Sequence, residues 1–310
     1  MQLVAHVPVL LDEVVRGLAV RPGGTYVDAT FGRGGHSGGI LARLGPQGRL
    51  LAIDRDPEAV VSGREISQKD SRFLIQQESF GMLRRFLEMQ GVQGEVDGIL
   101  FDLGVSSPQL EQPARGFSFQ VEGPLDMRMD PATSPSAAQW LDEAGENEIA
   151  AIIRRYGEET AAARIARAIV TRRAERPILT TTDLAEVVTL AVGRTRPGRH
   201  PATRVFQAIR MHVNRELEQI RDGLVQARDA LRAGGRLCVI SFHSLEDRIV
   251  KRFMRDCSRV SPALARLPVV PESARPSLRL VGGAIHPGIE ECARNPRARS
   301  AVLRIAEKLS

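Results

Sequence analysis

The chain has 310 residues, of which 43% are hydrophobic and 26% charged, and it carries a net charge of +6. This composition is typical of a folded, water-soluble protein with one large domain or two moderate ones. No run of about 18 apolar residues is present, which argues against a membrane-spanning helix. The N-terminus lacks the basic and apolar regions of a signal peptide. We therefore expect a cytoplasmic protein that does not contact a membrane.

The three cysteines, Cys238, Cys257 and Cys292, lie far apart and include no Cys-x-x-Cys pair. This spacing supports neither a structural zinc site nor a redox motif. We expect ordinary reduced thiols and no bound metal.

A short amphipathic helix is expected at residues 6–20, and the most informative stretch, 25–56, follows it. That stretch contains an apolar strand, a glycine-rich turn, a helix, and a second apolar strand that ends on Asp54. This order predicts the first β-α-β unit of a doubly wound, nucleotide-binding sheet. Glycines such as Gly32 and Gly34 allow positive φ and a close approach of the backbone to a ligand. A carboxylate at the tip of the second strand can accept both hydroxyls of an adenosine ribose.

The turn differs from the dinucleotide-binding pattern Gly-x-Gly-x-x-Gly because Ser37 occupies the last glycine position. This difference disfavours a dehydrogenase loop that binds pyrophosphate. S-adenosylmethionine, which has a ribose and an adenine but no phosphate, fits such a unit better. Two alternatives stay open at this point: a nicotinamide-dependent oxidoreductase, and a turn whose glycines serve only the architecture.

Further apolar segments complete the expected sheet. The expected strands are residues 25–29, 49–54, 72–77, 96–103, 236–242 and 300–306, the last in an antiparallel hairpin at the sheet edge. The expected helices between the first four are residues 35–44, 57–66 and 81–90. Ligands of open α/β sheets bind beyond the carboxyl ends of the strands. Gly32–His36, Asp54, Phe80 and Asp102 should therefore converge on one crevice.

The sheet pattern stops after the fourth strand. A long loop at 113–131, rich in glycine and proline, is typical of a functional or mobile segment. Helices are then expected at residues 136–143, 146–155, 158–173, 180–191 and 201–232. We interpret 108–216 as a helical insertion, for substrate recognition, in a domain built from residues 1–107 and 217–310.

The sheet resumes at 236–242, and a helix is expected over 243–254. Ser244 and Asp247 at its start resemble a capping box with Asp as the acidic member. Residues 258–295 are rich in proline and are expected to be irregular.

Basic residues are concentrated in the inserted segment. Between Ala150 and Arg215 there are 13 arginines and five acidic residues, a net charge of +8, so the rest of the chain carries −2. Clustered arginine favours contact with a polyanion such as nucleic acid, whereas a solvated helix surface is the alternative. Four arginines surround the proline- and glycine-containing break at 197–201 and are expected to contact RNA phosphates: Arg194, Arg196, Arg199 and Arg204.

Several stretches together resemble one family. They are Thr30–Ser37, Ala52–Asp56, Asp102–Leu110, Arg115–Phe119, Leu125–Asp130, His200–Arg204, Ser241–Arg248 and Asn295–Ser300. The chain resembles the RsmH/MraW family of bacterial small-subunit ribosomal RNA cytosine-N4-methyltransferases, and the likeness extends from about His6 to Ala306.

The resemblance implies a Rossmann-like, S-adenosylmethionine-dependent methyltransferase sheet interrupted by a helical domain. It also implies methyl transfer to the exocyclic N4 of one cytidine in the decoding region of 16S ribosomal RNA, as naked RNA or in the small subunit. The family's cofactor-binding positions fall here on Gly34, Gly35, His36, Asp54, Phe80, Asp102 and Gln109. His36 and Gln109 come mainly from the resemblance.

The exocyclic N4 of cytosine is a poor nucleophile because its lone pair is delocalised into the ring. Catalysis requires alignment of N4 with the methyl carbon and an acceptor for an N4 hydrogen, with no covalent intermediate. Asp102, Ser106 or Ser107 could supply the acceptor, as could a backbone carbonyl. Hydrogen bonding within the loop is the alternative role for the two serines.

Methylation at cytosine C5 would need a nucleophilic cysteine, commonly after a proline. Leu237, Asp256 and Glu291 precede the three cysteines, and none follows the fourth strand. The sequence therefore argues against C5 chemistry.

Two further residues are candidates for contact with RNA. His243 follows the strand 236–242 and could contact the base or act as a structural hydrogen-bonding group. Trp140, the only tryptophan, could stack on an extruded base or belong to the core of the insertion. A non-enzymatic alternative is an RNA-binding ribosome-assembly factor, against which the Gly34, Asp54 and Asp102 set argues.

Overall fold

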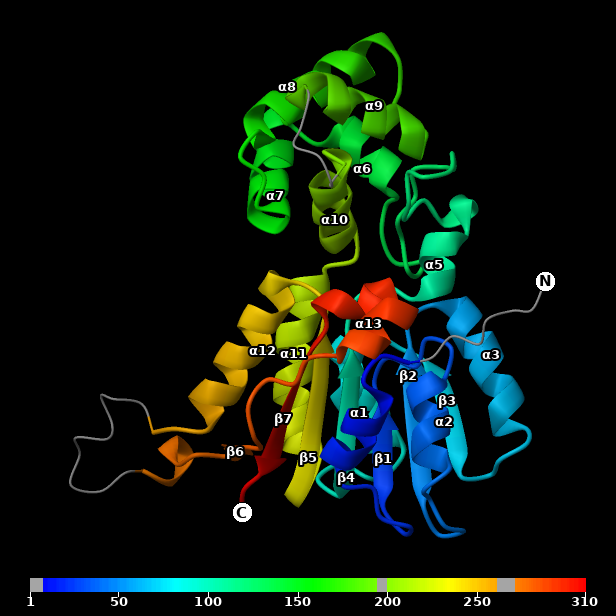
Figure 1. Ribbon diagram of the computed structural model, residues 1–310, viewed down its shortest axis with the longest axis vertical. Coiled ribbons are helices and arrows are strands. Elements are labelled where there is room, and N and C mark those ends of the chain that lie inside the picture. Colours follow the sequence, from blue (N-terminus) through cyan, green and yellow to red (C-terminus); the bar gives the residue numbers. More distant parts are fainter. Residues whose placement is uncertain (1–7, 194–199, 261–270) are drawn as a thin grey trace. The chain divides into compact units, whose positions relative to one another are not determined.

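The computed structural model describes residues 8–193, 200–260 and 271–310 (Figure 1). The chain forms two compact units. The sheet unit comprises Met1–Gly104 and Leu217–Ser310, and the helical unit comprises Val105–Glu216. Each is described by itself below.

The sheet unit contains a seven-stranded sheet in the order β3-β2-β1-β4-β5-β7-β6. Its strands are β1 (Thr25–Asp28), β2 (Arg49–Asp54), β3 (Phe73–Gln77), β4 (Val96–Asp102), β5 (Leu231–Ser241), β6 (Leu278–Leu280) and β7 (Val302–Lys308). The first five are parallel, and β7 is antiparallel to both of its neighbours. The strand order changes direction between β1 and β4, as in doubly wound sheets. The predicted fold class is therefore confirmed.

The strands are apolar because the sheet is covered. Four of the six residues of β2 and five of the seven of β4 are buried, as expected for parallel strands packed on both faces. Helices α1 (Leu11–Leu18) and α2 (Gly35–Leu41) contribute Val14, Leu18 and Ile40 to one core cluster that includes residues of β1, β2, β4 and β5.

The remaining helices of this unit follow the strands in chain order. They are α3 (Pro57–Ser67), α4 (Leu83–Met89), α11 (Glu216–Ala230), α12 (Ser244–Cys257) and α13 (Ile289–Arg294). Among the residues that the structure describes, every helix is too short or too polar to cross a lipid bilayer.

The last strand, β7, is antiparallel and pairs with β6 at the sheet edge, so the expected antiparallel pair at the edge is confirmed. The short β6, which occupies the outermost position, was not expected. Residues 258–295 were expected to be irregular, and three residues of strand carry too little alternation to be recognised. Strand β6 forms because it pairs with β7, with Leu278–Leu280 lying opposite Ala306–Lys308.

The helical unit has its own apolar core. Its helices are α5 (Ser107–Glu111), α6 (Ala137–Glu143), α7 (Glu146–Gly157), α8 (Ala162–Glu175), α9 (Thr181–Val192) and α10 (Ala202–Val213). One buried cluster contains residues of α6 to α10, such as Leu141, Ile153, Ile165 and Val188. The predicted helical insertion between β4 and β5 is thus present.

The prediction of a single helix over 201–232 is wrong, because this stretch forms two helices, α10 and α11. Asn214 ends α10, and Arg215 takes a left-handed φ of 50°. The Asn214 amide donates to Met127 O at 2.7 Å and accepts from Met129 N at 2.8 Å. This long-range contact, invisible in local sequence, interrupts the helix.

The loop at 113–131 is well packed. Met127 is fully buried. Arg115 donates to the carbonyl oxygens of Arg128 and Met129 at 3.1 and 3.0 Å. A Cβ on Gly116 would lie 2.3 Å from Pro124 O, so only glycine fits this approach of two backbone segments. Of the two expectations for this loop, a functional or a mobile segment, these contacts argue against the second.

Candidate active site

The carboxyl ends of β1, β2 and β4 lie at one edge of the sheet. These strands are adjacent and parallel, and each ends on a carboxylate: Asp28, Asp54 and Asp102. The structure thus brings together acids that are far apart in sequence. Such an edge beside the point where strand order reverses is the usual ligand site of this architecture.

Asp54 anchors the glycine-rich turn. Its Oδ2 accepts a hydrogen bond from Gly32 N at 2.7 Å, and its Oδ1 accepts one from Asp56 N at 2.9 Å. A carboxylate has about four lone-pair positions, so two backbone donors leave capacity for two more hydrogen bonds. The residue can therefore hold the turn and accept a pair of hydroxyl groups at the same time.

Desolvation by the surrounding protein raises the pKa of Asp54 to about 6, against 3.8 for an ordinary aspartate. Hydrogen bonds from Asp56 and Gly32 oppose this effect, because they favour the charged carboxylate. The group thus titrates close to neutral pH.

The three glycines of the turn have different roles. A Cβ on Gly34 (φ 75°) would lie 2.8 Å from the Phe31 ring, and one on Gly35 would lie 2.9 Å from Pro8 Cγ. These two glycines are required by packing within the protein. Only Gly32, with φ 56°, has an open side, where the nearest atom to a Cβ would be Thr30 O at 3.9 Å.

Asp102 has an unusual mixture of contacts. Its backbone N–H donates to Thr30 Oγ1 at 2.6 Å, and its Oδ2 lies 3.5 Å from His36 Nδ1. Its Oδ1 is buried and, within the described part of the chain, has no hydrogen-bond partner. A buried acceptor without a partner costs free energy, so it is evidence for a group that binds there.

His36 is buried and joins two distant segments. Its Nε2 lies 2.9 Å from Val9 O, and its Nδ1 faces Asp102. Burial lowers the pKa of His36, but the hydrogen bond and charge of Asp102 outweigh this effect and raise the pKa above its usual value. His36 therefore holds the Asp102 carboxylate in place.

Asp28 was missed in the sequence. Its Oδ2 accepts from Ser37 Oγ at 2.7 Å and its Oδ1 from Thr30 N at 3.1 Å. Burial raises the pKa of Asp28, although the Ser37 hydrogen bond opposes this shift. The available signal was an acid at the end of an apolar strand, the same signal that identified Asp54.

Phe80 lies just beyond β3, at the start of a short 3-10 helix, Phe80–Met82. Its ring meets the Phe101 ring edge to face, with centroids 5.6 Å apart and an interplanar angle of 84°. Phe80 is only half buried, so part of its surface is available for a planar ligand.

Ser106, Ser107 and Gln109 follow β4 in the chain and belong to the helical unit. Ser106 and Gln109 form the capping box of α5, in which Gln109 Oε1 accepts from Ser106 N at 3.0 Å. Ser107 is the first residue of this helix. Ser106 and Gln109 therefore have a structural role, which is to cap the start of α5.

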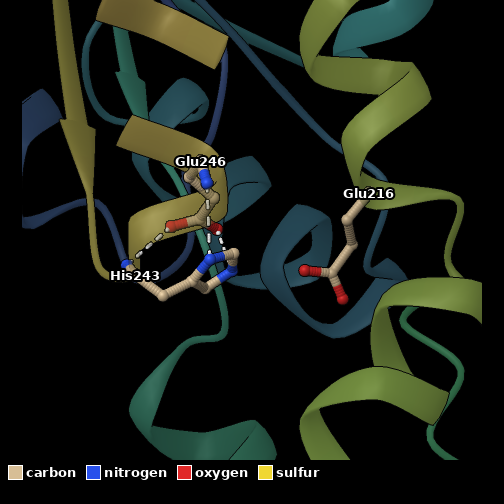
Figure 2. A group of neighbouring side chains, drawn as sticks. All are labelled: Glu216, His243 and Glu246. Atoms are coloured by element: carbon tan, nitrogen blue, oxygen red, sulfur yellow. Dashed lines mark hydrogen bonds and ion pairs between the residues drawn. The ribbon is translucent and has the colours of Figure 1, made fainter. Parts of the chain in front are cut away.

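His243 is the N-cap of α12 (Figure 2). Its Nδ1 accepts from Glu246 N at 3.4 Å, while Glu246 Oε2 accepts from Phe242 N at 2.8 Å. Glu246 is fully buried, and its Oε1 lies 3.1 Å from His243 Nε2. The capping box expected for Ser244 and Asp247 is therefore wrong by one residue, because histidine serves as the cap.

The remaining candidates for contact with RNA belong to the segment Val105–Glu216. Trp140 is 8% exposed, its Nε1 donates to Glu148 Oε1 at 3.2 Å, and its ring packs on His212. Trp140 therefore belongs to the core of the helical unit, and we do not retain the interpretation that it stacks on an extruded base. Arg204 is half exposed and lies 3.6 Å from Glu159. The other three, Arg194, Arg196 and Arg199, lie outside the described residues.

Comparison with known proteins agrees with the sequence motifs. Residues 3–309 match the model of the MraW methylase family. The chain is 55% identical over 307 residues to ribosomal RNA small subunit methyltransferase H of Thiobacillus denitrificans, which covers 99% of this chain and 98% of that protein. It is 52% identical over 306 residues to the protein of the same name from Coxiella burnetii, with 99% of each chain covered.

Proposed function

Because the chain belongs to the MraW methylase family, we propose that it transfers a methyl group from S-adenosylmethionine to the exocyclic N4 of a cytidine in the decoding region of small-subunit ribosomal RNA. The observation that carries this proposal is the match over nearly the whole chain, residues 3–309. The chain would act in the cytoplasm on RNA or the small subunit.

The carboxyl edge of the sheet fits the cofactor. When bound, S-adenosylmethionine supplies an electrophilic methyl group on a positively charged sulfur. The spare acceptor capacity of Asp54 suits the two ribose hydroxyls, and the unpartnered Oδ1 of Asp102 suits an amino group. The half-buried ring of Phe80 suits the adenine plane.

Four more residues complete the proposed cofactor set: Gly34, Gly35, His36 and Gln109. The two glycines let α2 begin close to the sheet edge, because any side chain there would clash with Phe31 or Pro8. His36 positions Asp102. Gln109, which caps α5, has the weakest support in its own contacts.

For the chemical step, Asp102 is the proposed acceptor of an N4 hydrogen. Its carboxylate is held by His36, and its buried Oδ1, which has no partner among the described residues, can accept two hydrogen bonds, one from the cofactor and one from N4. Accepting that hydrogen bond would raise electron density on N4 as the methyl group approaches. Ser106 and Ser107 are alternative acceptors, and the helical unit is the proposed substrate-recognition domain.

The test uses purified protein, methyl-labelled S-adenosylmethionine and small ribosomal subunits from cells that lack this enzyme. We expect one equivalent of label, located at N4 of a single decoding-region cytidine by nuclease digestion and mass spectrometry. Label on ring carbon C5, on a protein, or at no position would contradict the proposal. S-adenosylmethionine, but not NAD, should raise the thermal unfolding midpoint.

A further inference from the structure

The solvent-exposed face of α12 carries a row of positive charge. Lys251, Arg252 and Arg255 are all exposed, and Arg255 follows the other two by four and three residues, so they lie on one side of the helix. We call these three residues the α12 stripe. The side chains of Arg252 and Arg255 are 78% and 51% exposed.

The acidic residues of α12 do not balance this charge. Glu246 is buried against His243, and Asp247 pairs with Arg304 of β7 at 2.6 and 2.9 Å. Both carboxylates are therefore engaged by partners outside the stripe. Asp256 is the remaining acid of this helix, and it lies 3.5 Å from Arg252 and 2.9 Å from Arg255. Among the described contacts of Lys251, Arg252 and Arg255, this single acid faces three cations, so the face keeps a net positive charge.

Repulsion within the stripe opposes the favourable effect of cations near the C-terminus of a helix. Like charges three or four residues apart repel, whereas alternating signs on an exposed helix face stabilise it. The opposite face, with Val250 and Met254 buried, already accounts for the packing of α12 in the sheet unit. An ordinary solvated surface would not need this clustering of cations, but a polyanionic partner would gain from it.

The position of the stripe connects it with the candidate active site. Strand β5 runs parallel to β4, so its end at Ser241 lies at the same sheet edge as Asp102. Helix α12 begins three residues later, at Ser244. With a rise of 1.5 Å per residue, the stripe starts about 10 Å and ends about 17 Å from the beginning of the helix. It therefore leads away from the edge where the target base would bind.

We propose that the α12 stripe binds the phosphate backbone of the substrate RNA next to the target cytidine. This inference rests on the proposed function, and it adds a binding surface in the sheet unit to the one expected in the helical unit. Arginine and lysine contacts to phosphates supply affinity without reading sequence. The stripe would thus position the strand rather than select the base.

The test replaces three stripe residues by glutamine: Lys251→Gln, Arg252→Gln and Arg255→Gln in one protein. The matched control removes the same charge from exposed residues elsewhere in the sheet unit: Arg64→Gln, Lys69→Gln and Arg85→Gln. A third protein conserves charge with Lys251→Arg, Arg252→Lys and Arg255→Lys. Unchanged thermal shift with S-adenosylmethionine verifies folding in each.

We expect the stripe variant to raise KM for small subunits roughly tenfold with little change in kcat, and to bind deproteinised small-subunit RNA correspondingly more weakly. The slope of log affinity against log salt should fall by about two, as for three lost contacts to a single strand. The control and the charge-conserving protein should match the unmodified chain.

Three outcomes would overturn the proposal: unchanged RNA affinity, an equal loss in the control, or a loss on assembled subunits but not on deproteinised RNA. The last would indicate an acidic protein as the partner. RNA binding is measured without methyl transfer, so failure of the proposed function would be recognised separately.

Discussion

The carboxyl edge of the sheet unit and the core of the helical unit use buried polar groups in different ways. At the edge, Asp28 and Asp54 have raised pKa values, and Asp102 keeps an acceptor without a partner in the described chain. In the helical unit, the side chain of buried Asn214 donates to Met127 O and accepts from Met129 N.

The contrast separates function from architecture. Polar burial that is fully compensated stabilises a fold, whereas carboxylates with raised pKa values and incomplete hydrogen bonding are expensive and are found at functional sites. Substitutions at the sheet edge should therefore lower activity, whereas substitutions in the core of the helical unit should mainly lower the free energy of unfolding.

Replacing Asp102 by alanine should have the largest effect. If its carboxylate accepts the N4 hydrogen, the single-turnover rate at saturating S-adenosylmethionine should fall about 100-fold or more. Ser106→Ala and Ser107→Ala serve as controls and should stay within a few-fold of the unmodified protein. A large loss in either serine variant, with Asp102→Ala active, would transfer the acceptor role to that serine.

Asp54→Ala should weaken cofactor binding by about 1–3 kcal/mol, because the ribose hydroxyls lose their acceptor. Titration calorimetry measures the change directly. Asp70→Ala removes a carboxylate that pairs with Arg72 away from the site, and its affinity should be unchanged. Equal affinities for all three proteins would refute the ribose role.

Two glycines of one turn and helix form a matched pair. Gly34→Ala should lower the free energy of unfolding by about 1–2 kcal/mol, because alanine is strained at φ 75° and would meet the Phe31 ring. Gly38 lies inside α2 with nothing within 4 Å of a Cβ, so Gly38→Ala should stabilise by about 0.5–1 kcal/mol. Denaturant unfolding that gave both the same sign would show that the left-handed turn is not required.

Cofactor affinity should depend on pH through Asp54. Its pKa of about 6 lies above the ordinary 3.8, so its contribution to folding stability is full below about pH 4 and is lost as pH rises through 6. Binding has the opposite slope, since the ionised carboxylate accepts the hydroxyls. Affinity should rise about tenfold from pH 5 to pH 7. The profile should be flat in this range for Asp54→Asn, and a fall in affinity of the unmodified protein would contradict this account.

The strand ends could be predicted because their signal is local. An apolar run closed by an acid identified Asp54 and Asp102, and the change of period after the fourth strand identified the helical insertion. Asp28 gave the same local signal, but its importance depends on Ser37 and Thr30, which reach it only in the folded turn.

Features decided by long-range contact could not be predicted. Ser244 and Asp247 match a capping box as well as His243 and Glu246 do, and only the burial of Glu246 distinguishes them. The end of α10 depends on a hydrogen bond between Asn214 and Met127, 87 residues apart. Side-chain roles in binding depend on partners that no local pattern contains.

The smallest expected effect belongs to Trp140, on the helical side of the comparison. Trp140→Phe removes the hydrogen bond to Glu148 and part of the contact with His212, so the free energy of unfolding should fall by about 1 kcal/mol. The KM for RNA and kcat should not change, because the ring is buried in the core of its own unit. Glu148→Gln, which weakens the same hydrogen bond from the other side, should destabilise to a smaller degree. If Trp140→Phe instead raised KM for RNA while leaving stability intact, the indole would have to reach the substrate, and polar burial would no longer separate the two regions.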